Sequence, residues 1–492
     1  MPTRLLALAL VAQVAGVEVG VRLGAAGGIR PLLVAGVVVV VAAVGGGRYR
    51  GVLMLLAVLL VAAGLTQRSL TGLERVGLPG ALREGRDTPV RLTLVEDPVA
   101  LRFSARVLAR LDAWSPASGG WRPVGRRVAL GATGPLGARL ALTAAGDRLE
   151  GTGRFGPLRP WERHLRWRHA AGHLELVDLR DLTGPSSVWM RTANRLRDAV
   201  LAGVRHLPGA TRGLVAGLVL GDTRELPDRL VVAFREAGLS HLLVVSGSNV
   251  ALVLAVVAPL LAPLGLWGRC VGGLGTVLLF GTMTRWEPSV TRAVAMAAVT
   301  LLAGAIGRPQ ATLRVLVLAV GALLAVDPLL VRSLGFRLSV AATAGIAGLA
   351  GPLRAGLAAR VPAPGWVHTG IATSMAAHLG AAPVLLGTFG RVPLGSVPAN
   401  VLAAPLVGPL TVCGLVTGVV GGWVGPGIGR AVVVPTALLA GGLLTVARVA
   451  ARVSMPVGPG PWLAAGALLL LGAARGRARR AERAAAGRPP HR

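Results

Sequence analysis

Long apolar runs repeat along this chain of 492 residues, and they limit its fold more than any other feature. An α-helix needs about 20 mainly apolar residues to cross a bilayer, where it satisfies its own backbone hydrogen bonds. Such runs lie near 5–20, 31–45, 51–66, 242–264, 268–283, 290–306, 311–327, 336–350, 369–388, 396–422, 430–450 and 461–474. The sequence therefore predicts a polytopic α-helical membrane protein with about 12 spans. We expect Pro405 and Pro409 to interrupt the long run at 396–422.

The pattern changes between residues 70 and 182, where charge is dense and apolar residues are spaced apart. Segments such as "VRLTLVEDP" and "ARLALTAAGDRLEGTGRF" alternate apolar and polar residues between Gly, Pro and Asp turns. This alternation is typical of short β-strands, and about five strands of this kind suit an OB-like barrel. We therefore predict a small all-β domain inserted between the third and fourth apolar runs.

The predicted organisation has five parts. They are three N-terminal transmembrane helices at 1–69, the OB-like β-domain at 70–182, interfacial or amphipathic helices at 183–239, a transmembrane bundle at 240–474 and a basic tail at 475–492. The tail carries seven arginines and one glutamate, so the positive-inside rule places it in the cytoplasm. Three spans before the β-domain and nine after it then make that domain extracytoplasmic.

Charge narrows the possible partners. All 52 basic residues are arginine and the net charge is +31, which excludes a Schiff-base or P-loop lysine. Anionic lipid and a polyanion such as nucleic acid both explain this excess. Between residues 86 and 180, 16 arginines face 9 acids, with tryptophans among them. Such a mixture suits single-strand binding, although core packing or a membrane interface also explains the tryptophans. The candidate binding surface consists of Trp121, Arg122, Arg126, Arg127 and Trp167.

The later apolar runs contain mostly neutral polar residues. These are Ser246, Ser248, Asn249, Ser339, Thr343, Ser374, His378 and Asn400. Arg292 and Arg337 are the charged exceptions, and each is costly in a bilayer unless it faces a polar cavity or a partner. A proton- or sodium-coupled carrier usually keeps acidic residues at this depth, so the shortage of acids argues against that class.

The stretch "HLLVVSGSNV", residues 241–250, allows several interpretations. His241 and Ser246 could form a nucleophile pair, but no acid follows at a spacing that would orient the histidine. His241, His368 and His378 could bind a metal, but they form no recognised ligand pattern. Hydrogen bonding between helices and a polar conduit both account for Ser246 and Asn249. We expect no catalytic, cofactor or metal site in this chain.

Five blocks of the sequence resemble the ComEC family of bacterial competence proteins. They are "GLVLGDTRELPDRLVVAFREAGLSHLLVVSGSNVALVLAV" from Gly217, "PSVTRAVAMA" from Pro288, "DPLLVRSLGFRLSVAATAG" from Asp327, "HLGAAPVLLGTFGRVPL" from His378 and "PANVLAAPLVGPL" from Pro398. The order and spacing hold over about 200 residues. The three N-terminal spans and the β-domain are also similar to that family's layout.

The resemblance implies a channel that carries single-stranded DNA across the cytoplasmic membrane during natural transformation. The candidate conduit and motif residues are Gly221, Asp222, His241, Ser246, Gly247, Ser248, Asn249, Arg292, Arg337, Ser339 and Asn400, and all of them except Ser248, Asn249 and Arg337 match the family's motifs. The implied partners are single-stranded DNA, membrane lipid, a DNA receptor, a helicase and a separate nuclease, with homo-oligomerisation possible in principle.

This sequence departs from the family pattern at three points. Ser248 and Asn249 stand where the family often has Leu-His, and Arg337 stands where it often has Gln. Many members also end in a metallo-β-lactamase-like domain, and no His-x-His-x-Asp-His pattern occurs here. Two alternatives therefore stay open beside the DNA channel: a transporter of a smaller anion, and a scaffold without a pore that recruits DNA-uptake partners.

Overall fold

The computed structural model describes residues 3–23, 36–37, 39–40, 50–74, 85–116, 119–390, 392–393, 396–423, 426–453 and 456–457. The chain forms two compact units. The first consists of residues 1–231, 241–340 and 406–444, and the second of residues 232–240, 341–405 and 445–492. The runs predicted at 31–45 and 461–474 and the tail at 475–492 lie wholly or mostly outside the described residues.

Most of the described chain is helical. The α-helices are α1 (Thr3–Leu23), α3 (Arg50–Glu74), α5 (Gly134–Ala141), α6 (Val188–Gly203), α7 (Gly209–Leu220), α8 (Asp228–Glu236), α9 (Gly247–Leu261), α10 (Leu266–Met283), α11 (Pro288–Ala305), α12 (Thr312–Val326), α13 (Leu334–Ala358), α14 (Gly365–Phe389), α15 (Ser396–Trp423) and α16 (Pro426–Val453). The short 3₁₀ helices are η1 (Pro160–Arg168), η2 (Val204–His206), η3 (Ser240–Leu242) and η4 (Pro328–Arg332).

Nine of the described helices are long and apolar enough to cross a membrane, which agrees with a multi-pass membrane protein. The run predicted at 311–327 forms the shorter helix α12, so 12 full spans are not found within the described residues. Pro405 and Pro409 lie inside the single helix α15, contrary to the predicted interruption. Neighbouring helices and local adjustments can satisfy the groups that a proline frees inside a membrane bundle.

Helix α3 extends beyond the predicted end of the third span, to Glu74. Its last turns contain polar residues whose hydroxyl groups bond to the helix itself. The Thr66 hydroxyl donates to the Ala62 carbonyl at 2.8 Å, and the Ser69 hydroxyl donates to the Leu65 carbonyl at 3.1 Å. The apolar pattern ends before the helix does, and α3 continues five residues past residue 69.

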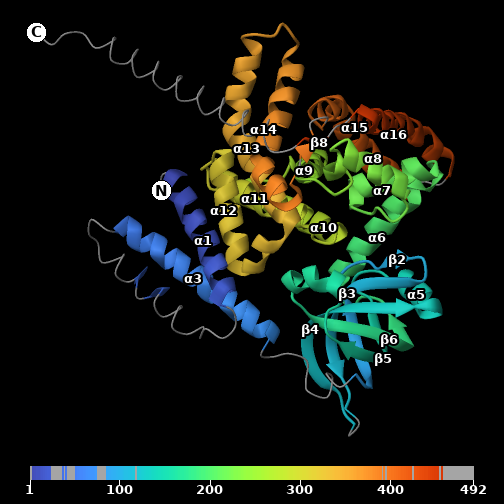
Figure 1. Ribbon diagram of the computed structural model, residues 1–492. Coiled ribbons are helices and arrows are strands. Elements are labelled where there is room, and N and C mark those ends of the chain that lie inside the picture. Colours follow the sequence, from blue (N-terminus) through green and yellow to red (C-terminus); the bar gives the residue numbers. More distant parts are fainter. Residues whose placement is uncertain are drawn as a thin grey trace, which may run out of the picture. The chain divides into compact units, whose positions relative to one another are not determined.

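A β-barrel-like sheet follows α3 (Figure 1). Its strands are β1 (Asp87–Leu94), β2 (Val99–Leu101), β3 (Ser104–Trp114), β4 (Arg122–Thr133), β5 (Arg148–Gly156) and β6 (Ala170–Thr183), in the order β1-β5-β6-β4-β3-β2. Strand β1 pairs with both β5 and β3, which closes the sheet. Only β4 and β6 run parallel, and α5 lies between β4 and β5 in the chain. We call this closed sheet the barrel.

Alternation of residues builds the barrel core. Along β1, Val90, Leu92 and Leu94 are buried and their neighbours are more exposed, because successive side chains of a strand point to opposite faces. They pack with buried residues from each of the other long strands, including Val107, Leu111, Val128, Leu130, Leu149, Phe155, Leu174 and Leu176. The alternation that predicted strands therefore also identifies which residues face inward.

The N-terminal helices α1 and α3 pack closely against each other (Figure 1). A Cβ atom built on Gly16 of α1 would lie 2.1 Å from the Leu59 carbonyl oxygen of α3, and one on Gly20 would lie 2.6 Å from the Ala63 carbonyl oxygen. The missing side chains allow the two backbones to approach, as is common between membrane helices.

In the second unit, α13 and α14 cross at a reciprocal pair of glycines. A Cβ atom on Gly345 would lie 2.2 Å from the Ala376 carbonyl oxygen, and one on Gly380 would lie 2.4 Å from the Ala341 carbonyl oxygen. A short two-stranded sheet in the same unit joins β7 (Val392–Pro393) to β8 (Pro456–Val457).

The glycine crossing predicts a position-dependent effect of added volume. Gly345→Val should lower the free energy of unfolding by about 1–3 kcal/mol, because the new side chain must push α14 away. Gly348→Val on the same helix is the matched control, since no atom lies within 4 Å of a Cβ atom built there. Thermal unfolding of both variants in detergent micelles measures the difference. Equal midpoints for the two variants would show that the close crossing does not matter.

Candidate functional site

A cluster of polar side chains marks the start of α9. Ser246 is the N-cap residue of this helix, but its hydroxyl does not cap the backbone. It lies 2.6 Å from the Ser248 hydroxyl and donates to Asn249 Oδ1 at 3.0 Å. Asn249 is fully buried, and its Nδ2 donates to the Leu218 carbonyl of α7 at 2.6 Å. Asn249 therefore links two helices, while the exposed Ser248 does not.

Arg292, in α11, approaches the same helix start. Its side chain is buried, its Nε donates to the Ser339 hydroxyl of α13 at 2.8 Å, and its Nη1 lies 3.1 Å from the Met296 sulfur. A Cβ atom on Gly247 would lie 2.6 Å from Arg292 Nη2, so Gly247 leaves the space that the guanidinium occupies. Within the described residues, Arg292 forms no ion pair with a carboxylate. We call Ser246, Gly247, Ser248, Arg292 and Ser339 the α9 cluster.

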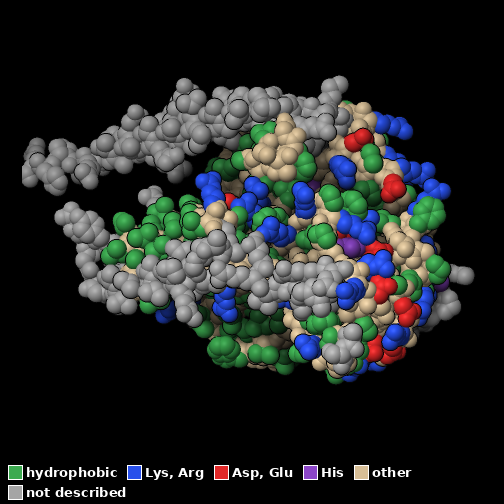
Figure 2. All heavy atoms as spheres, turned by 60° about the horizontal axis from the view of Figure 1, so that its bottom comes forward, with side chains coloured by type: hydrophobic (Ala, Val, Ile, Leu, Met, Phe, Trp, Pro, Cys, Tyr) green, Lys and Arg blue, Asp and Glu red, His purple; other side chains and the backbone are tan. Residues whose placement is uncertain are grey.

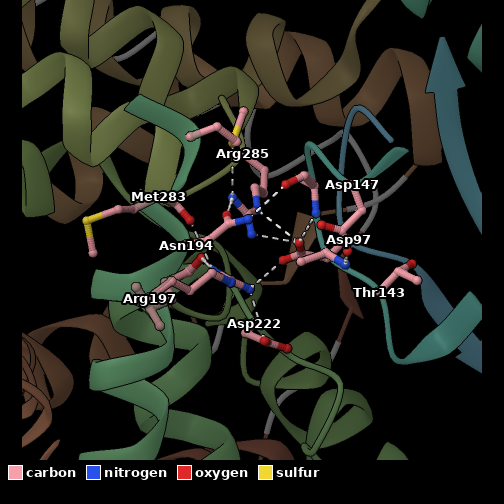
Figure 3. A network of polar contacts seen from close by, with 12 residues as sticks. Asp97, Thr143, Asp147, Asn194, Arg197, Asp222, Met283 and Arg285 are labelled. Atoms are coloured by element: carbon pink, nitrogen blue, oxygen red, sulfur yellow. Dashed lines mark hydrogen bonds and ion pairs between the residues drawn. The ribbon is translucent and has the colours of Figure 1, made fainter. Parts of the chain in front are cut away.

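A second cluster joins the barrel to the helices through buried ion pairs (Figure 3). Asp97 follows β1 and lies between two arginines: Arg285 Nη2 is 2.7 Å from its Oδ1, and Arg197 Nη2 is 3.0 Å from its Oδ2. Arg197 Nη2 also donates to Asp222 Oδ2 at 2.9 Å. These side chains are 10% exposed or less. We call Asp97, Arg197, Asp222 and Arg285 the buried ion-pair network.

Further hydrogen bonds fix the two arginines of this network. Arg197 Nη1 donates to the carbonyls of Leu220 and Met283, at 3.0 and 3.1 Å. Arg285 Nη1 donates to Asn194 Oδ1 at 2.8 Å, and Figure 3 shows Asn194 beside it on α6. The network therefore ties the barrel to α6, to the end of α7 and to the turn between α10 and α11.

Electrostatics keep both carboxylates charged. Burial alone would raise the pKa of Asp97, but the charges of Arg197 and Arg285 outweigh burial and hold that pKa below its usual value. Burial would likewise raise the pKa of Asp222, but a hydrogen bond from Arg224 and the charge of Arg197 lower it. Arg224 Nε reaches Asp222 Oδ1 at 2.8 Å. Asp222 thus belongs to the network that holds the barrel, rather than to the α9 cluster.

A third set of contacts lies where η1 of the barrel meets the N-terminal helices and η4. Trp167 is partly buried against Leu70, Leu73 and Leu329, with the Arg332 guanidinium 5.4 Å from its ring. His169 Nε2 lies 3.1 Å from Asp327 Oδ1. Trp167 therefore packs at an internal contact, and it is not an open stacking surface of the barrel.

The other candidate residues of the barrel fall into two places. Trp121 and Arg122 are exposed at the β3–β4 turn, where the Arg91 guanidinium lies 4.0 Å above the Trp121 ring. Arg126 is partly buried, and its Nη1 lies 3.6 Å from a Cβ atom built on Gly72 of α3. Arg127 donates from Nη1 to the Arg168 carbonyl at 3.2 Å, and burial lowers its pKa. The five residues predicted as one surface are thus not brought together.

Two exposed aromatic side chains mark a different part of the barrel, which sequence analysis did not single out. Phe103 is 75% exposed and Trp161 is 53% exposed. The Arg102 guanidinium lies 5.2 Å from the Phe103 ring, and those of Arg106 and Arg159 lie 5.4 and 5.8 Å from the Trp161 ring. An arginine next to an aromatic residue in "LRFSAR" and "RPWER" was the signal that could have identified them. On the face drawn in Figure 2, basic side chains are spread widely.

The remaining motif residues lie on several elements. Gly221 ends α7 with a positive φ of 73°, a conformation that glycine adopts without strain. His241, in η3, is exposed, as is Arg337 in the first turn of α13. Asn400 lies in the part of α15 that belongs to the second unit. No group of three or more His, Cys, Asp or Glu residues that could hold a metal ion occurs in the described parts of the chain.

These features define a class of protein: a multi-pass helical membrane protein that carries a basic barrel held by buried ion pairs. The sequence profile described as "Competence protein" matches residues 218–479, more than half of the chain. The chain therefore belongs to the competence protein family, which confirms the resemblance found in the sequence. The ComE operon protein 3 of Bacillus subtilis (strain 168) is 24% identical over 247 residues, covering 50% of this chain and 30% of that protein. No solved structure matches the chain.

The buried ion-pair network predicts a large effect of removing one charge. Arg197→Met should lower the free energy of unfolding by about 3–5 kcal/mol, because Asp97 and Asp222 would stay buried with less compensation. Arg212→Met is the matched control, since Arg212 pairs with Glu225 near the surface, where such pairs contribute about 0–1 kcal/mol. Chemical unfolding in mixed micelles compares the two variants. Equal losses would refute a special role for the network.

The lowered pKa values of Asp97 and Asp222 predict how stability depends on pH. A carboxylate whose pKa is lower in the folded state contributes stability above its unfolded pKa of about 4, and that contribution is lost as the pH falls through the folded value. The attachment of the barrel should therefore be constant from about pH 8 to 5 and weaken below about pH 4. Hydrogen exchange of the amides of residues 95–97 reports it. Weakening that begins near neutral pH would contradict this assignment, and Glu150→Gln, in an exposed pair with Arg91, should leave the profile unchanged.

Proposed function

We propose that this protein forms the passage by which single-stranded DNA crosses the cytoplasmic membrane during natural transformation. Membership of the competence protein family supports a role in DNA uptake. The observation that carries the proposal for this chain is the barrel itself, whose exposed arginine–aromatic pairs stand on a domain held to membrane helices by buried ion pairs. Receptor, helicase and nuclease functions would come from partner proteins.

The strand order supports an OB-type barrel that binds oligonucleotides. Strands β1, β3, β4, β5 and β6 close into one sheet, with α5 between the third and fourth of them. In the OB fold, the face of the second and third strands and the loops after the first and fourth strands bind single strands. Here those loops are residues 95–103 and 157–169, and they contain Phe103 and Trp161.

The chemistry of this face suits a strand of any sequence. Aromatic rings stack on bases whatever the base, and nearby arginines attract the phosphates. Arg102, Arg106 and Arg159 lie beside the two exposed rings. The same two loops also hold the barrel to the helices, through Asp97 in the first and His169 in the second. A strand bound there would already be next to the helices of the first unit.

The helices beyond the barrel offer few carboxylates to repel a polyanion. Two of these carboxylates, Glu287 and Asp327, lie at helix ends and not within the helices: Glu287 precedes α11 and Asp327 follows α12. Conduction requires binding that is strong enough for entry and weak enough for release. Hydroxyl groups and one arginine, as in the α9 cluster, meet this requirement better than a dense row of arginines would.

Removal of the exposed rings should weaken DNA binding. Phe103→Ala combined with Trp161→Ala should lower the affinity of the purified protein for a short thymidine oligonucleotide by at least about tenfold, since each stacked base contributes about 1–3 kcal/mol. Trp121→Ala is the matched control, because that ring lies under Arg91 at the β3–β4 turn. Fluorescence anisotropy at two salt concentrations measures binding. If only Trp121→Ala lowered the affinity for the oligonucleotide, the binding surface would instead lie around Trp121.

Uptake of labelled DNA by competent cells tests the function. Deletion of the gene should abolish nuclease-protected internal DNA while surface-bound DNA persists, and re-expression of the full chain should restore it. Normal internalisation in the deletion strain would refute the passage. In that case, saturable uptake of a small anion by vesicles that contain the protein would indicate a transporter.

A further inference from the structure

We propose that Arg292 and the first turn of α9 form a binding site for a phosphodiester group. The proposal rests on the proposed function for the origin of the ligand, which is the backbone of the passing strand. It names one place where the strand would be held. The chemistry would be the same for the phosphodiester of a phospholipid, and the experiment below separates the two sources.

The first argument is the charge of Arg292. The side chain is only 7% exposed, and it belongs to a helix long and apolar enough to span a membrane. An unpaired buried guanidinium is costly in such surroundings. Its partners among the described residues are the neutral hydroxyl of Ser339 and the sulfur of Met296. An anion is the component that would balance this charge.

The second argument is the position of the free end of the guanidinium. Nε and Nη1 are engaged, whereas Nη2 has no acceptor in the described part of the chain. Nη2 points to Gly247, where an added Cβ atom would lie only 2.6 Å away. Gly247 is the first residue of α9. The free nitrogen therefore lies directly against a helix N-terminus.

The third argument is that this helix N-terminus is uncapped by a side chain. The first turn of an α-helix has N–H groups without partners inside the helix, and the helix dipole makes this end positive. Ser246 occupies the N-cap position, but its hydroxyl is directed to Ser248 and Asn249. Two positive groups thus face each other here, and backbone N–H groups at a helix start bind phosphate well.

The geometry favours a phosphodiester over a carboxylate. The guanidinium offers one free nitrogen and the helix start offers backbone N–H groups. A guanidinium nitrogen together with backbone N–H groups can engage several of the tetrahedral oxygens of phosphate, whereas a carboxylate offers only a planar pair. A single site of this kind binds the strand at one phosphodiester only, so the strand can dissociate from it and move on.

Binding of dimethyl phosphate to the purified full chain in maltoside micelles tests the proposal. The probe is titrated at constant ionic strength against chloride, and binding is measured by calorimetry. Arg292→Gln should weaken binding by at least about tenfold, because it removes the only charge of the site. Arg308→Gln is the matched control, since Arg308 follows the other end of α11 and is exposed. Equal affinities for the wild type and Arg292→Gln, or no binding by the wild type, would overturn the proposal.

A second variant covers the case in which Arg292→Gln does not fold. Ser339→Ala keeps the charge and removes the hydroxyl that accepts from Arg292 Nε, so it should weaken binding severalfold. Unchanged affinity in this variant would count against the site. Competition distinguishes the sources: displacement of dimethyl phosphate by a short thymidine oligonucleotide assigns the site to the strand, and displacement by phosphatidylglycerol alone assigns it to lipid and overturns the assignment to DNA.

This experiment is independent of the uptake assay. Binding of dimethyl phosphate that depends on Arg292, together with normal uptake in the deletion strain, would refute the proposed function while leaving phosphodiester binding intact. Absent binding with uptake that depends on the gene would refute the site and leave the function standing.

Discussion

The ion pairs between Asp97 and the two arginines Arg197 and Arg285 are the interaction on which the arrangement of the first unit depends. They connect the turn after β1 to α6 and to the turn between α10 and α11. Buried ion pairs add little net stability compared with apolar packing, but they are costly to separate once formed. They therefore fix one orientation of the barrel on the helices, and that orientation brings the loops at 95–103 and 157–169 to the helical side.

The α9 cluster depends on that arrangement through α7. Asp222, directly after α7, pairs with Arg197, while Leu218 within α7 accepts the hydrogen bond from Asn249. The short helix thus has the ion-pair network at one end and the start of α9 beside it. A strand bound to the barrel and a phosphodiester bound near Arg292 would be held by parts of one connected structure.

Sequence analysis predicted the elements better than the partners of individual residues. Apolar runs located α9, α10, α11, α13 and α14 because length and hydropathy decide which segments enter a membrane. Alternation of apolar and polar residues located the strands, because successive side chains of a strand point to opposite faces. Asp222 and Ser246 are close in sequence within one family block, yet they belong to different clusters, since α8 and η3 lie between them in the chain. Arg197, which pairs with Asp222 and with Asp97, comes from outside that block. A single sequence cannot show such a pairing. Trp167 was assigned to a binding surface because composition does not reveal which tryptophan of a basic domain packs against a neighbouring helix.

Helix α7 has a consequence for how the protein is assembled. Most of its 12 residues are buried, on all sides of the helix, so it does not have the single apolar face expected for that part of the chain. One of its neighbours is Gly414 of α15, whose position leaves room for Val215 and Val219. That contact joins residues about 200 positions apart, and such long separations delay folding. While the ribosome is still making the middle of the chain, α7 lacks this partner, and at 12 residues it is too short to wait in the bilayer as a span of its own. The complete burial of α7 therefore requires a helix that the ribosome makes about 200 residues later.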